Sequence, residues 1–544
     1  MKKIIAVLLT LCVVFSLGVP AFAAEPVANY KLNTYKDFIT YNAPLTNTYK
    51  CLTEDRELNI VYFGGSVTEG YGVIKDVESW RALSLKWFKD TFPSATINGY
   101  NAAIGGTGTQ LGAIRLESDV IARDPDLVFI EFAMNDLYCG LSEKEAARYL
   151  ETIIRDIRTA KPNCDIVTLL IIDKSTAVSF SFPELCSTSK GHADISNAYN
   201  VPIIDVGNSI VETIFGGNED LSQWGNYFLS GDSVHPSKEG YIEYFNCIKE
   251  YLTNALLNTN FTGCEKTAHK IPDAVSDYVF DGDRKTIEGA DLKKMVVKAE
   301  GFKFDSDETG TGIHTHPGSW KATDITNASL TLKFTGTELL LWTNLTLGSS
   351  ISYSIDGGAE KIYNFPNLGL KPVVSGLNPG EHTLVIKPTS LQSDLSVFKI
   401  MAVCTRDASK QTKRPHTHAP VDDNWTKGDT EHYQVCDCGE KLNLGEHVFG
   451  EWTVVKEATE TTNGTRKREC EVCGKPETEK YTLSGDVISA SSAPESNTDV
   501  SSDVDLDVVI TPGVSSFPVI PVVIGGALVL IIVAVIIIVS KKKK

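Results

Sequence analysis

The chain has 544 residues, with 51 Lys and Arg against 69 Asp and Glu, and a formal net charge of −18. One hydrophobic core rarely grows past about 250–300 residues, so we expect several domains. A hydrophobic fraction of 42% excludes a wholly disordered chain. The acidic balance argues against nucleic acid as a partner, because phosphate binding needs a basic face. Twelve cysteines are too few for a disulfide scaffold of this length.

The first 23 residues have the pattern of a secretory signal peptide. Lys2 and Lys3 precede an apolar run from Ile4 to Val19, and Ala21-Phe22-Ala23 is typical of a cleavage site. We therefore expect residues 1–23 to be removed and the rest of the chain to be exported.

Between residues 24 and 262, short apolar runs alternate with amphipathic helical patterns. A capping box of Ser142 and Glu145 opens one expected helix, and another follows Pro236. This alternation predicts an α/β fold with a mostly parallel sheet covered on both faces, which binds ligands beyond the carboxyl ends of its strands. The expected strands are Leu58–Phe63, Thr96–Tyr100, Leu127–Phe132, Ile166–Ile172 and Ile203–Val206.

Five candidate site residues lie next to these strands or before the last helix. Ser66, Gly106 and Asn135 follow the first, second and third strands, and Asp232 and His235 precede the last helix. Each alone has an ordinary explanation as a helix cap or a turn residue. Their joint order along the strand ends favours a single site.

These segments resemble the four sequence blocks of the SGNH (GDSL-type) hydrolases, over Asn59–Tyr241. Gly106 matches the glycine of the second block by its distance from Asn101. The resemblance implies a three-layer α/β sandwich with a flavodoxin-like sheet and an esterase activity, which in many secreted bacterial members removes acetyl groups from polysaccharides. The other blocks read Gly64-Gly65-Ser66 for the usual Gly-Asp-Ser, Ala133-Met134-Asn135-Asp136 for Gly-x-Asn-Asp, and an intact Asp-x-x-His-Pro from Asp232 to Pro236.

The chemistry of the same residues suggests their roles. A serine hydroxyl becomes a nucleophile when a base takes its proton, and His235 is the natural base for Ser66. Asp232, three residues before it, can hold the ring and stabilise the imidazolium. The backbone amides of Ser66 and Gly106 and the side-chain amide of Asn135 could receive the oxyanion.

Two other hydrolase chemistries fit the sequence less well. The G-x-S-x-G elbow lacks its second glycine, because Val67-Thr68 follows Ser66. A metalloesterase needs clustered His and carboxylate ligands, and we expect the other histidine of this region, His192, to lie at the surface. We therefore expect no catalytic cofactor and an activity that survives chelators.

Residues 274–405 change to the alternating pattern of an antiparallel β-sandwich. They resemble, at the level of the fold, the jelly-roll modules that accompany carbohydrate-active enzymes. We expect Trp320 and Trp342 to lie in its core, with stacking on a glycan as the alternative. The expected strands are Leu330–Phe334, Glu338–Trp342, Ile351–Ile355 and His382–Ile386.

Residues 412–483 carry a repeated cysteine knuckle and interspersed histidines. They resemble small Cys/His repeats on surface proteins of anaerobic Gram-positive bacteria. Thiolate and imidazole ligands suit a structural zinc ion, and disulfides are the alternative outside a cell. One candidate ligand set is His432, Cys436, Cys438 and His447, with Cys470 and Cys473 in a second, incomplete set.

The end of the chain has the pattern of a membrane anchor. Residues 484–517 are acidic and serine-rich, which predicts a disordered linker. Residues 518–540 carry no charge and are long enough to cross the hydrocarbon core of about 30 Å as a helix. The lysines at 541–544 should stay cytoplasmic, which leaves everything before the helix outside the cell.

Together these segments predict a secreted serine esterase at the extracellular face of a cell membrane, in a Gram-positive bacterium. Its expected substrate is an acylated polysaccharide, foremost one with O-acetyl esters. Three alternatives stay open: acyl groups on lipid or peptidoglycan, acyl transfer to a sugar hydroxyl, and a glycan-binding protein whose hydrolase domain is a relic.

Overall fold

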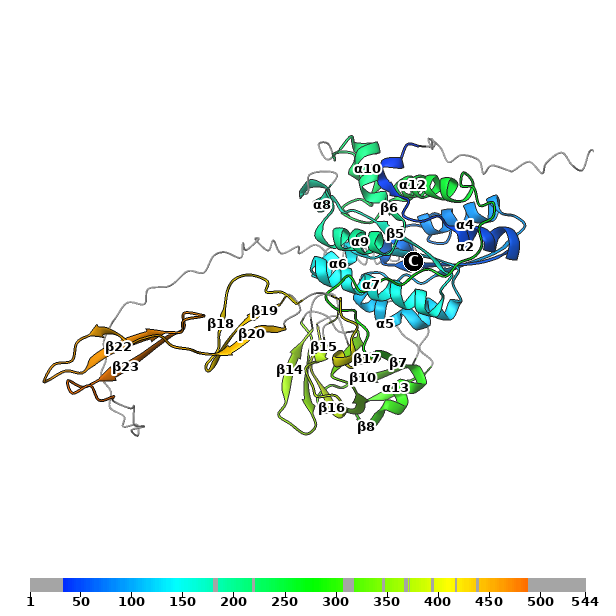
Figure 1. Cartoon of the computed structure of the whole chain (residues 1–544). Helices are drawn as coiled ribbons and strands as arrows, with labels where there is room; N and C mark the ends of the chain where they lie inside the picture. The colour runs from blue at the N-terminus through cyan, green and yellow to red at the C-terminus, as the bar shows by residue number, and fades with distance from the viewer. Residues whose placement is uncertain are drawn as a thin grey trace, which may run out of the picture. The chain divides into compact units, whose positions relative to one another are not determined.

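A computed structural model describes most of the chain between residues 33 and 487 (Figure 1). The predicted signal peptide at 1–23, most of the predicted linker and the segment 518–544 lie outside the described residues. Among the described residues, no helix has the length and apolar character needed to cross a membrane. The chain divides into two compact units, one reaching Pro420 and including 436–440, the other formed by 421–435 and the residues from 441 onward. The described ranges are 33–179, 184–217, 221–306, 318–344, 348–365, 370, 372–392, 396–415, 418–436 and 440–487.

The first unit begins with a six-stranded sheet in the order β1-β6-β5-β4-β2-β3. The edge strand β1 is antiparallel to β6, and the other neighbours are parallel. This confirms the predicted mostly parallel α/β sheet. Gly64 at the end of β2 pairs with Glu131 at the end of β4, so the turns after these two strands start side by side. The strands are β1 (Ile39–Thr40), β2 (Glu57–Gly64), β3 (Thr96–Asn101), β4 (Leu127–Glu131), β5 (Asp165–Leu170) and β6 (Ile203–Asp205).

Helices cover both faces of this sheet (Figure 1). Side chains of α4, α10 and α12 form one core cluster with the sheet, and those of α5, α7 and α9 form another. Ser142 and Glu145 make the predicted capping box of α7. Ser237 caps α12, the helix expected after Pro236. The helices are α2 (Thr46–Lys50), α3 (Ser66–Glu69), α4 (Trp80–Thr91), α5 (Thr109–Asp119), α6 (Ala133–Tyr138), α7 (Glu143–Ala160), α8 (Lys174–Ser179), α9 (Ser187–Ala198), α10 (Val206–Phe215), α11 (Trp224–Tyr227) and α12 (Lys238–Leu256).

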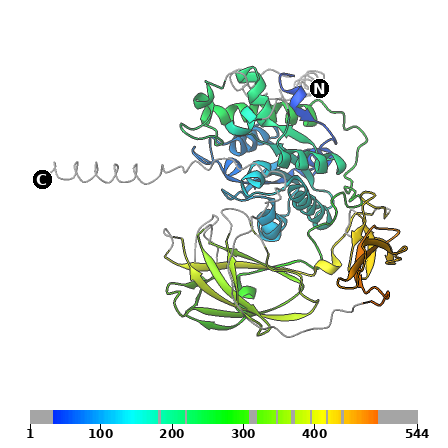
Figure 2. The same ribbon diagram turned by 90° about the vertical axis from the view of Figure 1, so that its left-hand side faces the viewer.

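An antiparallel β-sandwich follows in the same unit, with its strands green to yellow in Figure 2. One sheet has the order β15-β12-β17-β10-β9, with β7 also paired to β17, and the other has the order β14-β13-β16-β11-β8. The four strands expected from the sequence are present as β11, β12, β13 and β16. The elements are β7 (Lys285–Glu288), α13 (Gly289–Met295), β8 (Val296–Glu300), β9 (Lys303–Asp305), β10 (Ser319–Ala322), β11 (Ser329–Thr335), β12 (Glu338–Thr343), β13 (Ser350–Ile355), β14 (Lys361–Asn364), β15 (Pro372–Val374), β16 (Glu381–Ser390) and β17 (Phe398–Arg406).

Strand β12 is buried on both of its faces. Leu339 and Leu341 belong to the core of the sandwich. Leu340 and Trp342 belong instead to the core cluster that contains α5 and α7. Trp320 and Trp342 are 9% and 3% exposed, which confirms that both tryptophans lie in cores rather than on a glycan-binding surface.

The second unit consists of two small antiparallel sheets, β18-β19-β20 and β21-β22-β23. Few of its side chains are buried, so little apolar burial stabilises it. Its strands are β18 (Thr426–Lys427), β19 (Glu431–Val435), β20 (Lys441–Glu446), β21 (Thr453–Lys456), β22 (Gly464–Glu469) and β23 (Pro476–Tyr481).

Candidate active site

Ser66 is the first residue of α3, directly after β2. The amide of Gly65 donates to the Glu131 carbonyl at 3.2 Å, which joins this turn to the end of β4. Gly70 ends the short helix with φ 92°, a conformation that favours glycine. The tight turn presents the Ser66 hydroxyl at the carboxyl edge of the sheet.

Ser66, His235 and Asp232 form a continuous series of hydrogen bonds. The Nδ1 of His235 lies 2.7 Å from Asp232 Oδ2, and its Nε2 lies 2.7 Å from Ser66 Oγ. Because an ionised carboxylate can only accept, Nδ1 carries the proton and Nε2 accepts from the serine hydroxyl. The structure therefore brings together the three residues that the sequence analysis expected in one site.

Asp232 is held in its ionised form. Partial burial acts to raise its pKa, but hydrogen bonds from the amides of His235 and Val234 and from the His235 ring outweigh it, so the pKa lies below its usual value. Those amides donate to Asp232 Oδ1 at 3.0 and 2.8 Å. One carboxylate oxygen thus fixes the loop while the other fixes the ring.

The two other predicted residues lie beside Ser66. A Cβ on Gly65 would stand 2.2 Å from Asn135 Oδ1, so the Asn135 side chain fills the space that glycine leaves open. A Cβ on Gly105 would stand 3.4 Å from the Cβ of Ser66, which brings the loop of Gly106 to the same point. Gly106 itself has φ 74°. Amide donors from two neighbouring turns can therefore face the carbonyl oxygen of an ester attacked by Ser66.

The α/β domain is similar to a known protein family and to solved structures. Residues 62–241 match the model of the GDSL-like lipase/acylhydrolase family. The crystal structure of a two-domain esterase active on acetylated mannans has a TM-score of 0.56 at 21% identity, over 71% of this chain and all of that protein. A second structure of such an esterase, co-crystallized with mannopentaose, has a TM-score of 0.55 at 20% identity over the same shares. No curated protein matches this chain.

The family match confirms the resemblance to SGNH hydrolases for the segment that carries the four blocks. At 21% identity, the structural likeness shows the fold. Its coverage of 71% exceeds the predicted span of the α/β domain, so the shared fold extends into the β-sandwich.

Three buried ionisable residues beneath the Ser66 turn were not among the residues predicted from the sequence. The first is Arg115 of α5, whose side chain is fully buried. Its guanidinium donates to the carbonyls of Ala102 and Gly64, at the ends of β3 and β2, and pairs with Asp119 at 2.8 Å. Arg115 therefore joins the strand ends that deliver Ser66 and the Gly106 loop.

The second is Asp136, which accepts from the amide and the hydroxyl of Thr109 at 2.7 and 2.8 Å. Thr109 begins α5, just after the Gly106 loop, and Asp136 follows Asn135 in α6. The His192 Nε2 lies 2.8 Å from Asp136 Oδ2, and both side chains are fully buried. Asp136 thus joins the turn that carries Asn135 to the start of α5, just after the Gly106 loop.

The prediction that His192 lies at the surface is wrong. His192 is in the second turn of α9, on the face that packs against α6, where Thr188 also donates to the Ala133 carbonyl at 2.7 Å. Thr188, His192 and Ser196 recur every four residues and are all buried. This spacing places the three residues on one face of the helix and could have indicated a buried face. Because all three are polar, the face resembled an exposed one.

The third is Glu131, at the end of β4. It is fully buried and accepts from the Thr68 hydroxyl of α3 at 2.8 Å. Burial raises its pKa to about 8, against the lowering effect of hydrogen bonds from Thr68 and Gly65. A neutral carboxylic acid therefore supports the turn that carries Ser66 near neutral pH.

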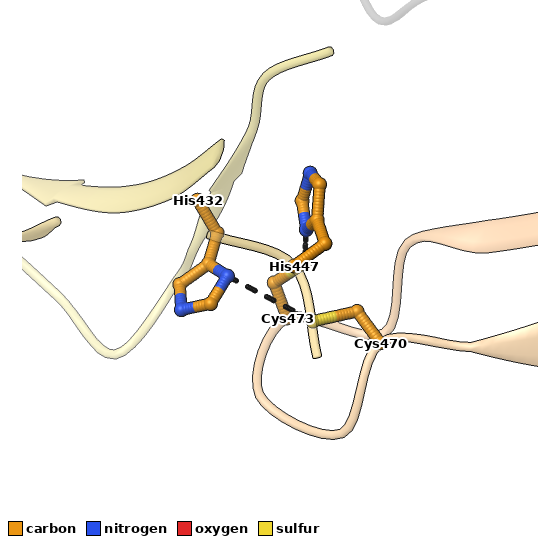
Figure 3. A group of neighbouring side chains, drawn as sticks. All are labelled: His432, His447, Cys470 and Cys473. Carbon is orange, nitrogen blue, oxygen red and sulfur yellow. Dashed lines mark hydrogen bonds between the residues drawn. The ribbon is translucent and has the colours of Figure 1, made fainter. Parts of the chain in front are cut away.

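The second unit holds a separate group of ligating side chains, His432, His447, Cys470 and Cys473 (Figure 3). Their nearest ligand atoms all lie within 4.8 Å of one another. The Nδ1 of His432 is 3.8 Å from Cys470 Sγ, and the Nδ1 of His447 is 3.5 Å from Cys473 Sγ. The His447 Nε2 donates to the Gly428 carbonyl at 3.0 Å, which leaves Nδ1 free of its proton to bind an ion. This group could hold a metal ion.

The membership of this group differs from the set expected from the sequence. His432 and His447 come together with the second cysteine knuckle, whereas Cys436 lies outside the group and Cys438 lies outside the described residues. The pairing of β19 with β20 brings the two histidines near each other, and the bridge between Phe449 and Cys470 brings them to the turn after β22. Eight cysteines in the described part of the chain are free thiols: Cys51, Cys164, Cys186, Cys247, Cys264, Cys404, Cys470 and Cys473.

The raised pKa of Glu131 predicts how the unfolding free energy depends on pH. Its pKa is about 8 in the folded protein and 4.5 in an ordinary setting, so the folded state keeps a proton that the unfolded state releases. This stabilisation is complete below pH 4.5 and is lost as the pH rises through about 8. We expect Glu131→Gln to flatten the fall of the unfolding free energy between pH 5 and 8, by roughly 1 kcal/mol per pH unit.

The measurement is denaturant unfolding of the full chain across that pH range. The control Glu117→Gln removes an exposed carboxyl of the same domain and should keep the wild-type slope. Equal slopes for Glu131→Gln and the wild type would contradict the prediction.

Proposed function

We propose that the α/β domain is a serine esterase. The observation that carries this proposal is the series Ser66–His235–Asp232, with both links at 2.7 Å, beside the turns of Gly106 and Asn135. A hydroxyl, a base with a fixed tautomer and converging amide donors are the parts that acyl transfer requires.

The mechanism follows from this geometry. His235 Nε2 takes the Ser66 proton while Oγ attacks the ester carbonyl, and Asp232 stabilises the resulting imidazolium. The amides of Ser66 and Gly106 and the side chain of Asn135 donate to the oxyanion. His235 then gives its proton to the leaving alcohol, and an acyl-serine remains. A water molecule, deprotonated by His235, attacks the acyl-serine and releases the carboxylic acid and the free hydroxyl of Ser66.

The proposed substrate is a polysaccharide that carries O-acetyl esters. A solved structure whose fold covers 71% of this chain is that of an esterase active on acetylated mannans. The sandwich that follows the α/β domain here is part of that shared fold. Acyl groups on lipid or peptidoglycan, and transfer to a sugar hydroxyl instead of water, are the competing outcomes.

The proposed location is the extracellular face of the cell membrane, on a Gram-positive cell. Support comes from the apolar run at residues 4–19, the uncharged run at 518–540 and the four terminal lysines. The acidic segment 484–517 would then hold the enzyme away from the bilayer.

We further propose that His432, His447, Cys470 and Cys473 bind a zinc ion that stabilises the second unit. Zinc lies about 2.0–2.3 Å from nitrogen and sulfur ligands, which requires donors as close together as these. The set supplies four protein ligands, as structural zinc sites do, and leaves no position for substrate. The unit buries little apolar surface, so a bound ion would add stability that its core does not supply.

The esterase proposal predicts the behaviour of the full chain on 4-nitrophenyl acetate. We expect Ser66→Ala to reduce the rate to that of buffer, because the hydroxyl that His235 activates is lost. Asn135→Ala should lower kcat/KM by about 10²–10³-fold, because one oxyanion donor is lost. The control Ser94→Ala changes an exposed serine of the same domain and should keep the wild-type rate.

A wild-type rate equal to that of Ser66→Ala would favour the glycan-binding alternative. With acetylated oligosaccharides, free acetate indicates hydrolysis, whereas an acetylated acceptor indicates transfer.

The location predicts that the full chain stays with membranes washed in alkaline carbonate. Deletion of residues 518–544 should release the protein into the medium, because the apolar run is then missing. Protease added to intact cells should digest the full chain. Protection from protease, or retention of the deletion variant on membranes, would contradict the proposal.

The zinc proposal predicts about one zinc ion per chain by elemental analysis. Cys470→Ser and Cys473→Ser should lose it, and the second unit should become sensitive to protease. The control Cys436→Ser should retain zinc, because Cys436 lies outside the group. If Cys436→Ser loses zinc and Cys470→Ser retains it, the result would contradict this proposal and support the ligand set expected from the sequence. Ester turnover should persist after chelation, since none of these residues belongs to the Ser66 site.

A further inference from the structure

Tyr71 is an exposed aromatic side chain fixed beside His235. The two ring centroids are 4.4 Å apart, and 56% of Tyr71 is exposed. Its amide donates to the Ser66 carbonyl at 3.0 Å, and its carbonyl accepts from the Tyr241 hydroxyl at 3.3 Å. The residue lies between Gly70 and Gly72, which both have positive φ. The backbone is therefore held on both sides while the ring stays in solvent.

Tyr138 is a second exposed ring, at the end of α6. It lies one helical turn after Asn135 and is 44% exposed. Its hydroxyl donates to the buried carboxylate of Asp173. The Asp173 side chain is held in turn by the Thr176 amide, which donates to it at 2.7 Å. Here the hydroxyl is anchored and the ring is left exposed.

Both rings lie close to the same short loop, Asp232–His235. Tyr71 contacts it through the His235 ring. Tyr138 is connected to it through Asp173, because the amide of the next residue, Lys174, donates to the Ser233 carbonyl at 2.8 Å. Tyr71 adjoins His235, whereas Tyr138 belongs to α6, the helix that carries Asn135. Exposed aromatic side chains ordinarily keep their rotational freedom in solvent. These two are restrained before any ligand arrives, which reduces the entropy that binding would cost.

We propose that Tyr71 and Tyr138 form sugar-binding subsites, on which pyranose rings next to the esterified unit stack. This inference rests on the proposed esterase function and specifies its substrate as a chain of sugars rather than a single acylated unit. A pyranose presents a face of C–H groups and a rim of hydroxyls, which suits an aromatic face with solvent at its edge. The two subsites would place the scissile ester over Ser66 by binding the residues around it.

Acyl chains are the main competing ligand for these rings. An acyl chain is held by an enclosed apolar pocket that removes it from water. Tyr71 and Tyr138 are instead half exposed, and the hydroxyl of Tyr138 is tied to a carboxylate. Partial exposure of both rings favours a ligand that also stays partly hydrated, as a glycan does.

The test compares acetylated mannooligosaccharides of two to six units with 4-nitrophenyl acetate, using the full chain. For the wild type, we expect kcat/KM on the oligosaccharides to rise with chain length. In Tyr71→Ala and Tyr138→Ala this rise should shrink, with a loss of about tenfold per ring on the longest substrate beyond any loss on 4-nitrophenyl acetate. Tyr71→Trp keeps an aromatic face and should retain the dependence on length.

Tyr41→Ala is the matched control. Tyr41 is 43% exposed, its hydroxyl accepts from Asn254 at 3.0 Å, and its ring lies 5.5 Å from that of Tyr251. These partners are at the far end of α12 from His235, so this variant should keep the wild-type rates on both substrates.

The outcomes separate this inference from the proposed function. If the wild type hydrolyses 4-nitrophenyl acetate but releases no acetate from any oligosaccharide, the polysaccharide substrate and the subsites are both overturned. If it does release acetate, but the two alanine variants lose equal activity on both substrates, the subsites alone are overturned. A larger loss on 4-nitrophenyl octanoate than on the oligosaccharides would assign the rings to an acyl chain instead.

Discussion

The hydrogen bond between His235 and Asp232 decides which ring nitrogen faces Ser66, and the rest of the site depends on that choice. Asp232 can only accept, so the proton stays on Nδ1 and Nε2 is left with its lone pair. The carboxylate also binds the amides of Val234 and His235, which fixes the loop that carries the ring. One side chain thus sets the tautomer, the ring orientation and the loop conformation together.

Beneath Ser66, His235 and Asp232 lie three buried ionisable residues. Arg115 binds the carbonyls at two strand ends, Asp136 joins the turns before α5 and in α6, and Glu131 supports α3. Burying such groups costs free energy unless hydrogen bonds compensate for the lost water. Here those hydrogen bonds run to the short turns around Ser66 and so hold these turns in place. Each turn bears a chemical group that tolerates little displacement.

Much of the fold and of the site was predictable, because the relevant signals are local. Apolar runs of strand length define the sheet, and Ser66, Asn135 and His235 sit in short motifs beside those runs. The supporting residues were not predictable in the same way. His192 lies in a polar helix, and only the approach of α6 explains its burial. The partners of His432 and His447 were likewise misassigned, since closeness in sequence favoured Cys436 whereas strand pairing brought Cys470 and Cys473.

Strand β12 has a consequence for the architecture. Its alternate side chains enter two different cores, Leu339 and Leu341 on one side and Leu340 and Trp342 on the other. A boundary drawn between the α/β domain and the sandwich would expose apolar surface on both pieces. We therefore expect the two folds to unfold together, and replacement of either one would also require new side chains along β12.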